Sequence, residues 1–209
     1  ALQVRIVNTE CQDVAWRPLD SLGIFDIQCN ADEVLQHFSL KTSDCQGVTN
    51  GVRIEYGCLK GELESTKEIY HTGCYSMEGY VAELSDAGGI ECPGLGVLSE
   101  WKQLEYDPNV CAAFGDSVIE YECAKPKARV VFGGGTPSVV DEETARPGRT
   151  MYKYQTECNT DGPVAYLDRH SIGSQCQGGH FALKSWEVKK CEAGFEAGFY
   201  IEYECEELD

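Results

Sequence analysis

The sequence has no long hydrophobic run and few basic residues, and each shortage excludes a class of protein. No apolar stretch approaches the ~20 residues that a membrane-spanning helix needs, so we expect no membrane span. Only 17 lysines and arginines stand against 35 acidic residues, and the resulting net charge of −18 repels nucleic acid and anionic membranes. We therefore expect neither of them as a partner.

The sequence also lacks the spacings that mark metal and cofactor sites. No CxxC pair occurs, whereas zinc sites usually combine two close cysteine or histidine pairs. A crowded acidic face would bind divalent cations weakly, but no DxDxDG-type calcium loop is present. The glycines at 133–135 are not followed by the Gly-Lys-Ser/Thr of a phosphate-binding loop and indicate a turn. We expect no metal and no cofactor.

Cysteine, by contrast, is abundant, and its spacing repeats. The 12 cysteines form three sets of four, and the second cysteine of every set lies 18 positions after the first. So many evenly distributed cysteines predict disulfides and an oxidising compartment, which makes the protein secreted. The sets are Cys11, Cys29, Cys45 and Cys58; Cys74, Cys92, Cys111 and Cys123; and Cys158, Cys176, Cys191 and Cys205.

One five-residue sequence motif, which we call the repeated phrase, ends at the fourth cysteine of each set. Ile, Tyr and Cys alternate with polar residues in it, which is the period of a strand with one buried face. The glutamates of the phrase then face away from the core, and we expect them to be solvated. The three copies are Ile54-Glu55-Tyr56-Gly57-Cys58, Ile119-Glu120-Tyr121-Glu122-Cys123 and Ile201-Glu202-Tyr203-Glu204-Cys205.

Apolar positions around the cysteines repeat as well. A triplet follows each second cysteine, and Phe38, Trp101 and Trp186 align within it as predicted core residues. A Val-Ala pair precedes each second cysteine, at 14–15, 81–82 and 164–165, and Asp20 and Asp168 recur beside it as expected turn-capping residues. The triplets are Leu35-Phe38-Leu40, Leu98-Trp101-Leu104 and Leu183-Trp186-Val188.

These repeats predict one pseudo-threefold domain over residues 1–209, because a unit of about 60 residues barely buries a core alone. The units are repeat 1 at 1–60, repeat 2 at 61–124 and repeat 3 at 151–209. Each opens with an alternating strand, at 2–7, 67–71 and 151–155, and no sustained helical period appears. The predicted class is all-β, with a loop or linker at 125–150 that includes one possible strand at 129–132.

Four cysteines in a unit allow three pairings. We favour the second with the fourth, because the fourth cysteine shares the buried face of Ile and Tyr, and the first with the third. Each bridge then closes a loop of roughly 30 residues and contributes on the order of 3 kcal/mol, mostly through the unfolded state.

No catalytic constellation is evident, and we expect no enzymatic activity. The four histidines occupy no common place in the repeats, and the repeat uses every cysteine. Asp168 and His170 lie too close in sequence for a catalytic triad, whose members come from separate parts of a fold. The repeated Glu55, Glu120 and Glu202 would share one environment, whereas a glycosidase needs two carboxylates in different environments.

Aromatic residues between the first and second cysteines are the best binding candidates. Trp16, Tyr75, Tyr80 and Tyr166 lie in these variable segments, where exposed rings would stack on sugars. This pattern allows a carbohydrate-binding module with extracellular glycans as partners.

One segment resembles the vitelline membrane outer layer protein I family. Members of this family run from a cysteine through a Phe-X-Leu strand to an Asn-Gly-Ile-Arg-like strand that ends in cysteine. Here Cys29, Phe38-Ser39-Leu40-Lys41 and Asn50-Gly51-Val52-Arg53-Ile54, leading into Cys58, follow that order. The resemblance implies a β-prism, in which three sheets surround a pseudo-threefold axis, and a role in an extracellular coat or matrix.

The leading functional hypothesis is a secreted, disulfide-stapled structural protein that builds an extracellular coat, matrix or filament. A homo-oligomer or polymer would form through the N-terminal strand, where Val4 and Ile6 are the candidate assembly residues, because an exposed strand edge is able to pair with a neighbouring subunit. The alternative is the lectin-like module.

Overall fold

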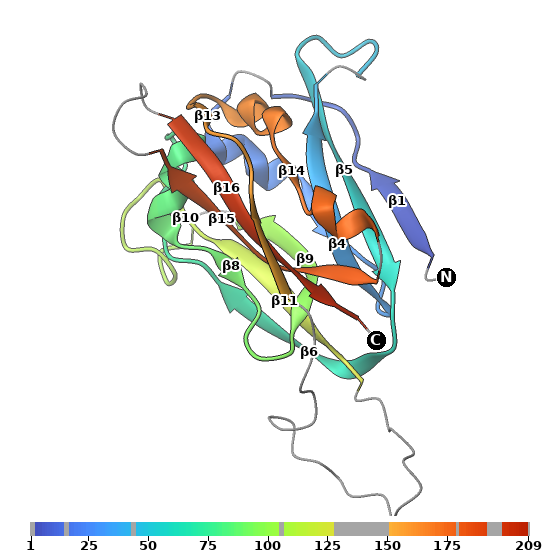
Figure 1. Ribbon diagram of the computed structural model, residues 1–209. Coiled ribbons are helices and arrows are strands. Elements are labelled where there is room, and N and C mark those ends of the chain that lie inside the picture. The colour runs from blue at the N-terminus through green and yellow to red at the C-terminus, as the bar shows by residue number, and fades with distance from the viewer. Residues whose placement is uncertain are drawn as a thin grey trace, which may run out of the picture.

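The computed structural model describes residues 3–14, 17–42, 45–104, 107–127, 151–178, 180–191 and 198–208. Strands dominate these residues, so the all-β prediction is confirmed (Figure 1). The four helices in the described ranges are short 3₁₀ helices, and none of them is long and apolar enough to span a membrane. They are η1 (Leu19–Ile24), η2 (Val81–Ala87), η3 (Val164–Arg169) and η4 (Ser174–Gly178).

Three larger sheets contain most of the strands. The first has the order β1 (Val4–Asn8), β5 (Gly51–Lys60), β4 (Glu33–Lys41) and β14 (Ser171–Ile172), with β2 (Gln12–Asp13) also on β5. The second has the order β6 (Leu63–His71), β11 (Ile119–Pro126), β9 (Val97–Gln103) and β3 (Asp26–Gln28). The third has the order β12 (Met151–Gln155), β16 (Gly198–Glu207), β15 (Phe181–Lys190) and β8 (Ile90–Glu91), with β13 (Asn159–Thr160) on β16. A separate ladder joins β7 (Tyr75–Ser76) to β10 (Asp116–Ser117).

Each sheet ends in a short strand that comes from another unit of the sequence. β3 precedes Cys29 in the first unit but pairs with β9 of the second sheet. β8, from the second unit, pairs with β15 of the third sheet, and β14, from the third unit, returns to β4 of the first sheet. The three units therefore exchange strands in a cycle, which the sequence pattern did not predict.

The repeated phrase fixes the ends of these exchanged strands. Its Ile, Tyr and Cys are buried in all three copies, as predicted. The hydroxyl of Tyr56 donates to the carbonyl of Gln28 at 3.2 Å, at the end of β3, and Tyr121 donates to the carbonyl of Glu91 at the same distance. The Tyr203 hydroxyl lies 3.3 Å from that of Ser174. Each such bond contributes about 1 kcal/mol. The bonds of Tyr56 and Tyr121 tie β3 and β8 back to the sheets of their own units, whereas Ser174 lies in η4, just after β14.

All 12 cysteines are paired, second with fourth and first with third in each unit, as favoured above. The second cysteine directly follows β3 or β8, so its bridge anchors the exchanged strand beside the tyrosine bond. The bridges are Cys11–Cys45, Cys29–Cys58, Cys74–Cys111, Cys92–Cys123, Cys158–Cys191 and Cys176–Cys205.

One apolar core includes residues from all three sheets. At its centre Phe38, Trp101 and Trp186 are buried, and their ring centroids lie 5.2, 5.4 and 5.3 Å apart. Tilted and edge-to-face aromatic pairs at such distances add about 0.5–1.5 kcal/mol each beyond the burial itself. The prediction that the two tryptophans belong to the core is confirmed.

A β-bulge shifts the register at the same point in each sheet, with Gln36, Ser99 or Lys184 as the extra residue. After the bulge, regular alternation from Trp101 brings Gln103, not Leu104, opposite Ile119, as Leu40 lies opposite Ile54. The predicted triplet of the second unit was therefore wrong by one position.

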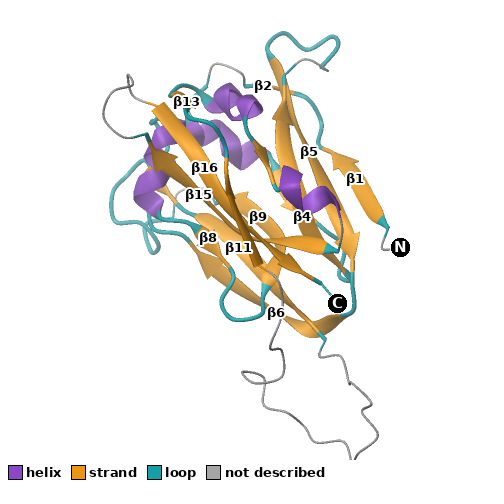
Figure 2. Cartoon of the chain, in the orientation of Figure 1, coloured by secondary structure: helices purple, strands orange, loops and turns teal. Residues whose placement is uncertain are grey.

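Three of the helices gather at one end of the sheets (Figure 2). Backbone N–H groups at their starts donate in a ring: Leu19 to Gly79 at 3.1 Å, Val81 to Gly162 at 3.1 Å and Val164 to Arg17 at 3.1 Å. Leu19, not Val14, is thus the counterpart of Val81 and Val164, and the alignment of residues 14–15 was wrong.

The two repeated aspartates occupy different places in their helices. Asp20 lies in the first turn of η1, whereas Asp168 lies late in η3, and no side chain caps either helix. Their predicted common role in capping was therefore wrong.

The last strand of the second unit continues beyond residue 124. β11 continues to Pro126, and the N–H of Lys127 donates to the carbonyl of Glu62 at 2.8 Å. The ladder therefore extends past the predicted end at 124, and the possible strand at 129–132 lies outside the described residues.

Candidate functional site at the sheet edges

β1, β6 and β12 are edge strands, each paired on one side only within the described residues. In the first sheet the N–H of Thr9 donates to the carbonyl of Ile54 at 2.9 Å, and the same bond recurs from Thr72 to Ile119 and from Thr156 to Ile201. Because bonding alternates along an antiparallel ladder, alternate residues direct their N–H and C=O to the free side. These are Val4, Ile6 and Asn8; Lys67, Ile69 and His71; and Met151, Lys153 and Gln155.

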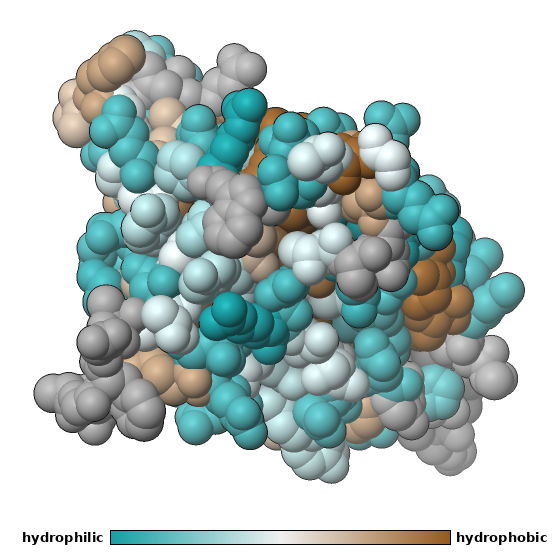
Figure 3. Space-filling model, turned by 90° about the horizontal axis from the view of Figure 1, so that it is seen from above, coloured by the Kyte–Doolittle hydropathy of each residue, from teal (hydrophilic) through white to brown (hydrophobic). Residues whose placement is uncertain are grey.

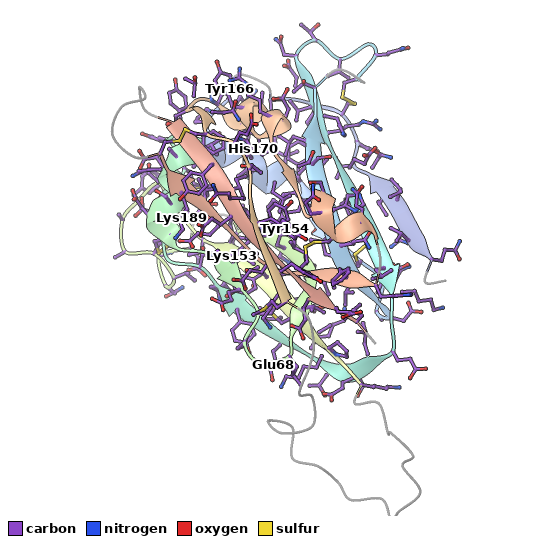
Figure 4. The ribbon with its side chains drawn as sticks, in the orientation of Figure 1. Glu68, Lys153, Tyr154, Tyr166, His170 and Lys189 are labelled. Carbon is purple, nitrogen blue, oxygen red and sulfur yellow. A yellow bond between two sulfur atoms is a disulfide. The ribbon has the colours of Figure 1, made fainter. Side chains whose placement is uncertain are left out.

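The side chains at the middle of these edges differ among the sheets. Ile6 is 53% exposed and Ile69 is 58% exposed, although both are large apolar side chains. The third edge has Lys153 at the corresponding place, opposite Glu204 (Figure 4). Free backbone groups next to exposed isoleucine are able to pair with another strand, whereas an edge lysine opposes such pairing. Two edges are therefore open to association and one is protected.

A fixed charge accompanies each open edge. On β1 the Nε of Arg5 donates to Oε1 of Glu33 at 3.0 Å, and this bond holds the pKa of Glu33 below its usual value. On β6 Glu68 accepts from the hydroxyl of Tyr70 and from Nζ of Lys125 at 3.2 Å, and these bonds lower the pKa of Glu68. Each open edge thus carries an ion pair, in which the edge strand supplies the guanidinium of Arg5 on β1 and the carboxylate of Glu68 on β6.

The outer face of the third sheet is hollowed. The hollow has a volume of about 150 Å³, and carboxylates from three strands, Glu91, Glu187, Glu202 and Glu204, line it together with Ser185. Lys153 reaches across it to Oε2 of Glu202 at 3.2 Å, and that contact raises the pKa of Lys153. Hydrogen-bonding side chains, most of them acidic, therefore line this hollow.

The four aromatic glycan-binding candidates differ in their exposure. Trp16 lies outside the described residues, and Tyr75 is buried in β7, so its predicted exposure was wrong. Burial also raises the pKa of Tyr75. Tyr80 is exposed, and Tyr166 is half-buried, with the Arg169 guanidinium 4.3 Å from the centre of its ring. Figure 3, which views the helix end from above, shows hydrophobic residues scattered among hydrophilic ones.

The groups considered for catalysis lie apart. Glu55, Glu120 and Glu202 belong to three different sheets, and Lys41, Lys102 and Lys153, respectively, are their cationic neighbours. Asp168 accepts from the hydroxyl of Thr42 at 2.8 Å, whereas Nδ1 of His170 lies 2.6 Å from Oγ1 of Thr156. In the described part of the chain no three His, Cys, Asp or Glu side chains are placed so that they could hold a metal ion together.

Sequence reasoning identified Val4 and Ile6 but missed Ile69 and Lys153. A usable signal was present, because Ile6, Ile69 and Lys153 each lie five positions before the first cysteine of their set. Comparison of the units at that spacing would have shown the two isoleucines and the lysine together.

No family model, no curated protein and no solved structure matches this chain. The resemblance to the vitelline membrane outer layer protein I family therefore stays a prediction.

Proposed function

We propose that this chain is a secreted structural protein that assembles with copies of itself into an extracellular coat, matrix or filament, without catalytic activity. The observation that carries the proposal is the pair of open edges, β1 with Ile6 and β6 with Ile69. Exposed strand edges of this kind bind other strands through main-chain hydrogen bonds. Six disulfides suit a protein that must persist in an oxidising environment.

The proposal includes a pseudo-threefold, prism-like arrangement of three repeats. Three observations support it: the corresponding strand orders of the sheets, the cyclic exchange of β3, β8 and β14, and the nearly equal distances within the central aromatic trio. Such an arrangement directs three sheet edges away from a common core, and a rigid body with several edges is suited to assembly.

The size of the native, non-reduced protein tests the proposal. A net charge of −18 opposes self-association at low ionic strength, and salt screens that repulsion. We expect light scattering and electron microscopy to show particles larger than the 23.1 kDa monomer that grow as the salt is raised to physiological strength. A monomer at every salt and protein concentration would contradict the proposal.

Carbohydrate binding is the second candidate function, and the hollow on the third sheet favours it. We expect a glycan array to give saturable signals that Glu204→Gln weakens, because Glu204 lines the hollow. Glu55→Gln is the matched control, since Glu55 lies on the first sheet and not in the hollow. An array without signal would remove this candidate and leave the assembly proposal intact.

A further inference from the structure

The two open edges, β1 and β6, are able to pair with each other as antiparallel strands. If a β6 strand lies antiparallel beside β1 with Ile69 opposite Ile6, the residues that face the free side of each strand meet. Each such pair exchanges two backbone hydrogen bonds, and the two exposed isoleucines cover one another. The three pairs are Val4 with His71, Ile6 with Ile69, and Asn8 with Lys67.

The charges on the other face of the strands select the partner. In this register Arg5 lies opposite Tyr70 of the second copy, and Glu68 of the second copy is its diagonal neighbour, within reach of a long side chain. If two β1 strands paired instead, with Ile6 opposite Ile6, the two copies of Arg5 would be diagonal neighbours across the strands. If two β6 strands paired with Ile69 opposite Ile69, the two copies of Glu68 would be diagonal neighbours in the same way. Charge complementarity therefore favours β1 with β6 over either strand with itself.

The third edge lacks this match. Lys153 stands where the other edges carry isoleucine, and it already contacts Glu202 at 3.2 Å. Burial of its ammonium group under a neighbouring strand would cost far more than burial of isoleucine. Only two of the three edges are then available for growth.

We propose that copies of this chain join head to tail, with β1 of one copy bound antiparallel to β6 of the next, Ile6 opposite Ile69, and Lys153 limiting growth to a linear, unbranched polymer. The inference rests on the proposed function and names the partner surface and its register. A head-to-tail contact uses two different surfaces, so each added copy leaves one edge free, and the polymer extends unless its rotation closes a ring.

Two single substitutions and their mixture test the pairing, by sedimentation velocity of non-reduced protein at physiological salt. Ile6→Lys blocks the β1 edge and Ile69→Lys blocks the β6 edge, and we expect each variant alone to be a 23.1 kDa monomer. An equimolar mixture keeps one intact β1 and one intact β6 edge, and we expect a species of twice the monomer mass. That species would also show that both variants are folded.

The control is Ile24→Lys, at an isoleucine that is 48% exposed on η1, away from the edges, and we expect it to assemble like the native chain. Lys153→Ile should open the third edge and give branched particles by electron microscopy. Dimers of either blocked variant alone, or native-like assembly of both, would overturn this pairing and leave the proposed function standing. A native chain that stays monomeric would instead remove the proposed function, and this inference with it.

Discussion

Acid sensitivity follows from the environment of His170, which is fully buried at the end of η3 (Figure 4). Its Nδ1 lies 2.6 Å from Oγ1 of Thr156, its ring packs 4.6 Å from that of Phe199, and Nε2 has no hydrogen-bond partner among the described residues. Burial, with a smaller contribution from the charge of Arg169, lowers the pKa of His170 from 6.5 to about 4. The folded state therefore keeps a neutral imidazole in mildly acidic solution.

The difference in proton binding between the folded and unfolded states decides whether acid raises or lowers the stability. Between pH 6.5 and pH 4 the unfolded chain takes up a proton at His170 and the folded chain does not, so the free energy of unfolding falls as the pH falls through this window. Above pH 6.5 both states are neutral at this residue, and below pH 4 both are protonated. A difference of about 2.5 pKa units corresponds to a loss of about 3 kcal/mol.

Urea unfolding at pH 7 and pH 4 measures this loss in the non-reduced protein, with fluorescence from the buried Trp101 and Trp186 as the signal. Carboxylates also titrate in this range, so the informative quantity is the difference between the native chain and His170→Phe, which has no titrating group at this position. We expect the native chain to lose about 3 kcal/mol more than the variant. His180→Phe, at an exposed histidine, is the control and should retain the native loss. Equal losses for the native chain and His170→Phe would refute the reasoning.

Three further substitutions test the packing, each by urea unfolding at pH 7. Tyr121→Phe leaves the carbonyl of Glu91 without its 3.2 Å bond and should lower the free energy of unfolding by about 1 kcal/mol. Lys184→Met removes the cation that lies 2.9 Å from the carboxylate of Glu206 in a buried pair, so we expect a loss of about 3–5 kcal/mol. Trp101→Ala empties the centre of the aromatic trio and should cost about 3–5 kcal/mol.

The features that sequence reasoning predicted well are those with a local period. Alternation placed Ile54, Tyr56 and Cys58 on one buried face, and that shared face is the reason for the favoured pairing of the fourth cysteine with the second, which the structure has. The strand expected at 151–155 coincides with β12. For the strands, the side chains that decide the structure are neighbours along one strand, so a period of two is enough to detect them.

The features that sequence reasoning missed either have no detectable period or differ from the predicted position by one residue. β8 and β14 are two residues long, too short for any alternation, and they pair with strands of another unit. Leu104 is the nearest apolar residue after Trp101, but the strand alternates by two, so the polar Gln103 occupies the triplet position opposite Ile119. Turns of 3₁₀ helix six or seven residues long likewise give no helical period.

Comparison of the three sheets with each other separates residues that build the fold from residues that are free to serve a function. Where all three agree, as in the tyrosine and the fourth cysteine of the repeated phrase, the side chains are buried, and those of the first two units anchor exchanged strands. Five positions before the first cysteine the sheets differ, with isoleucine twice and lysine once, although the backbone there is the same edge strand. Three identical isoleucine edges would link copies into a branched network, whereas one lysine reduces the number of open edges to two. Because the fold tolerates either side chain at this position, we propose that the choice between them sets how copies of the chain assemble.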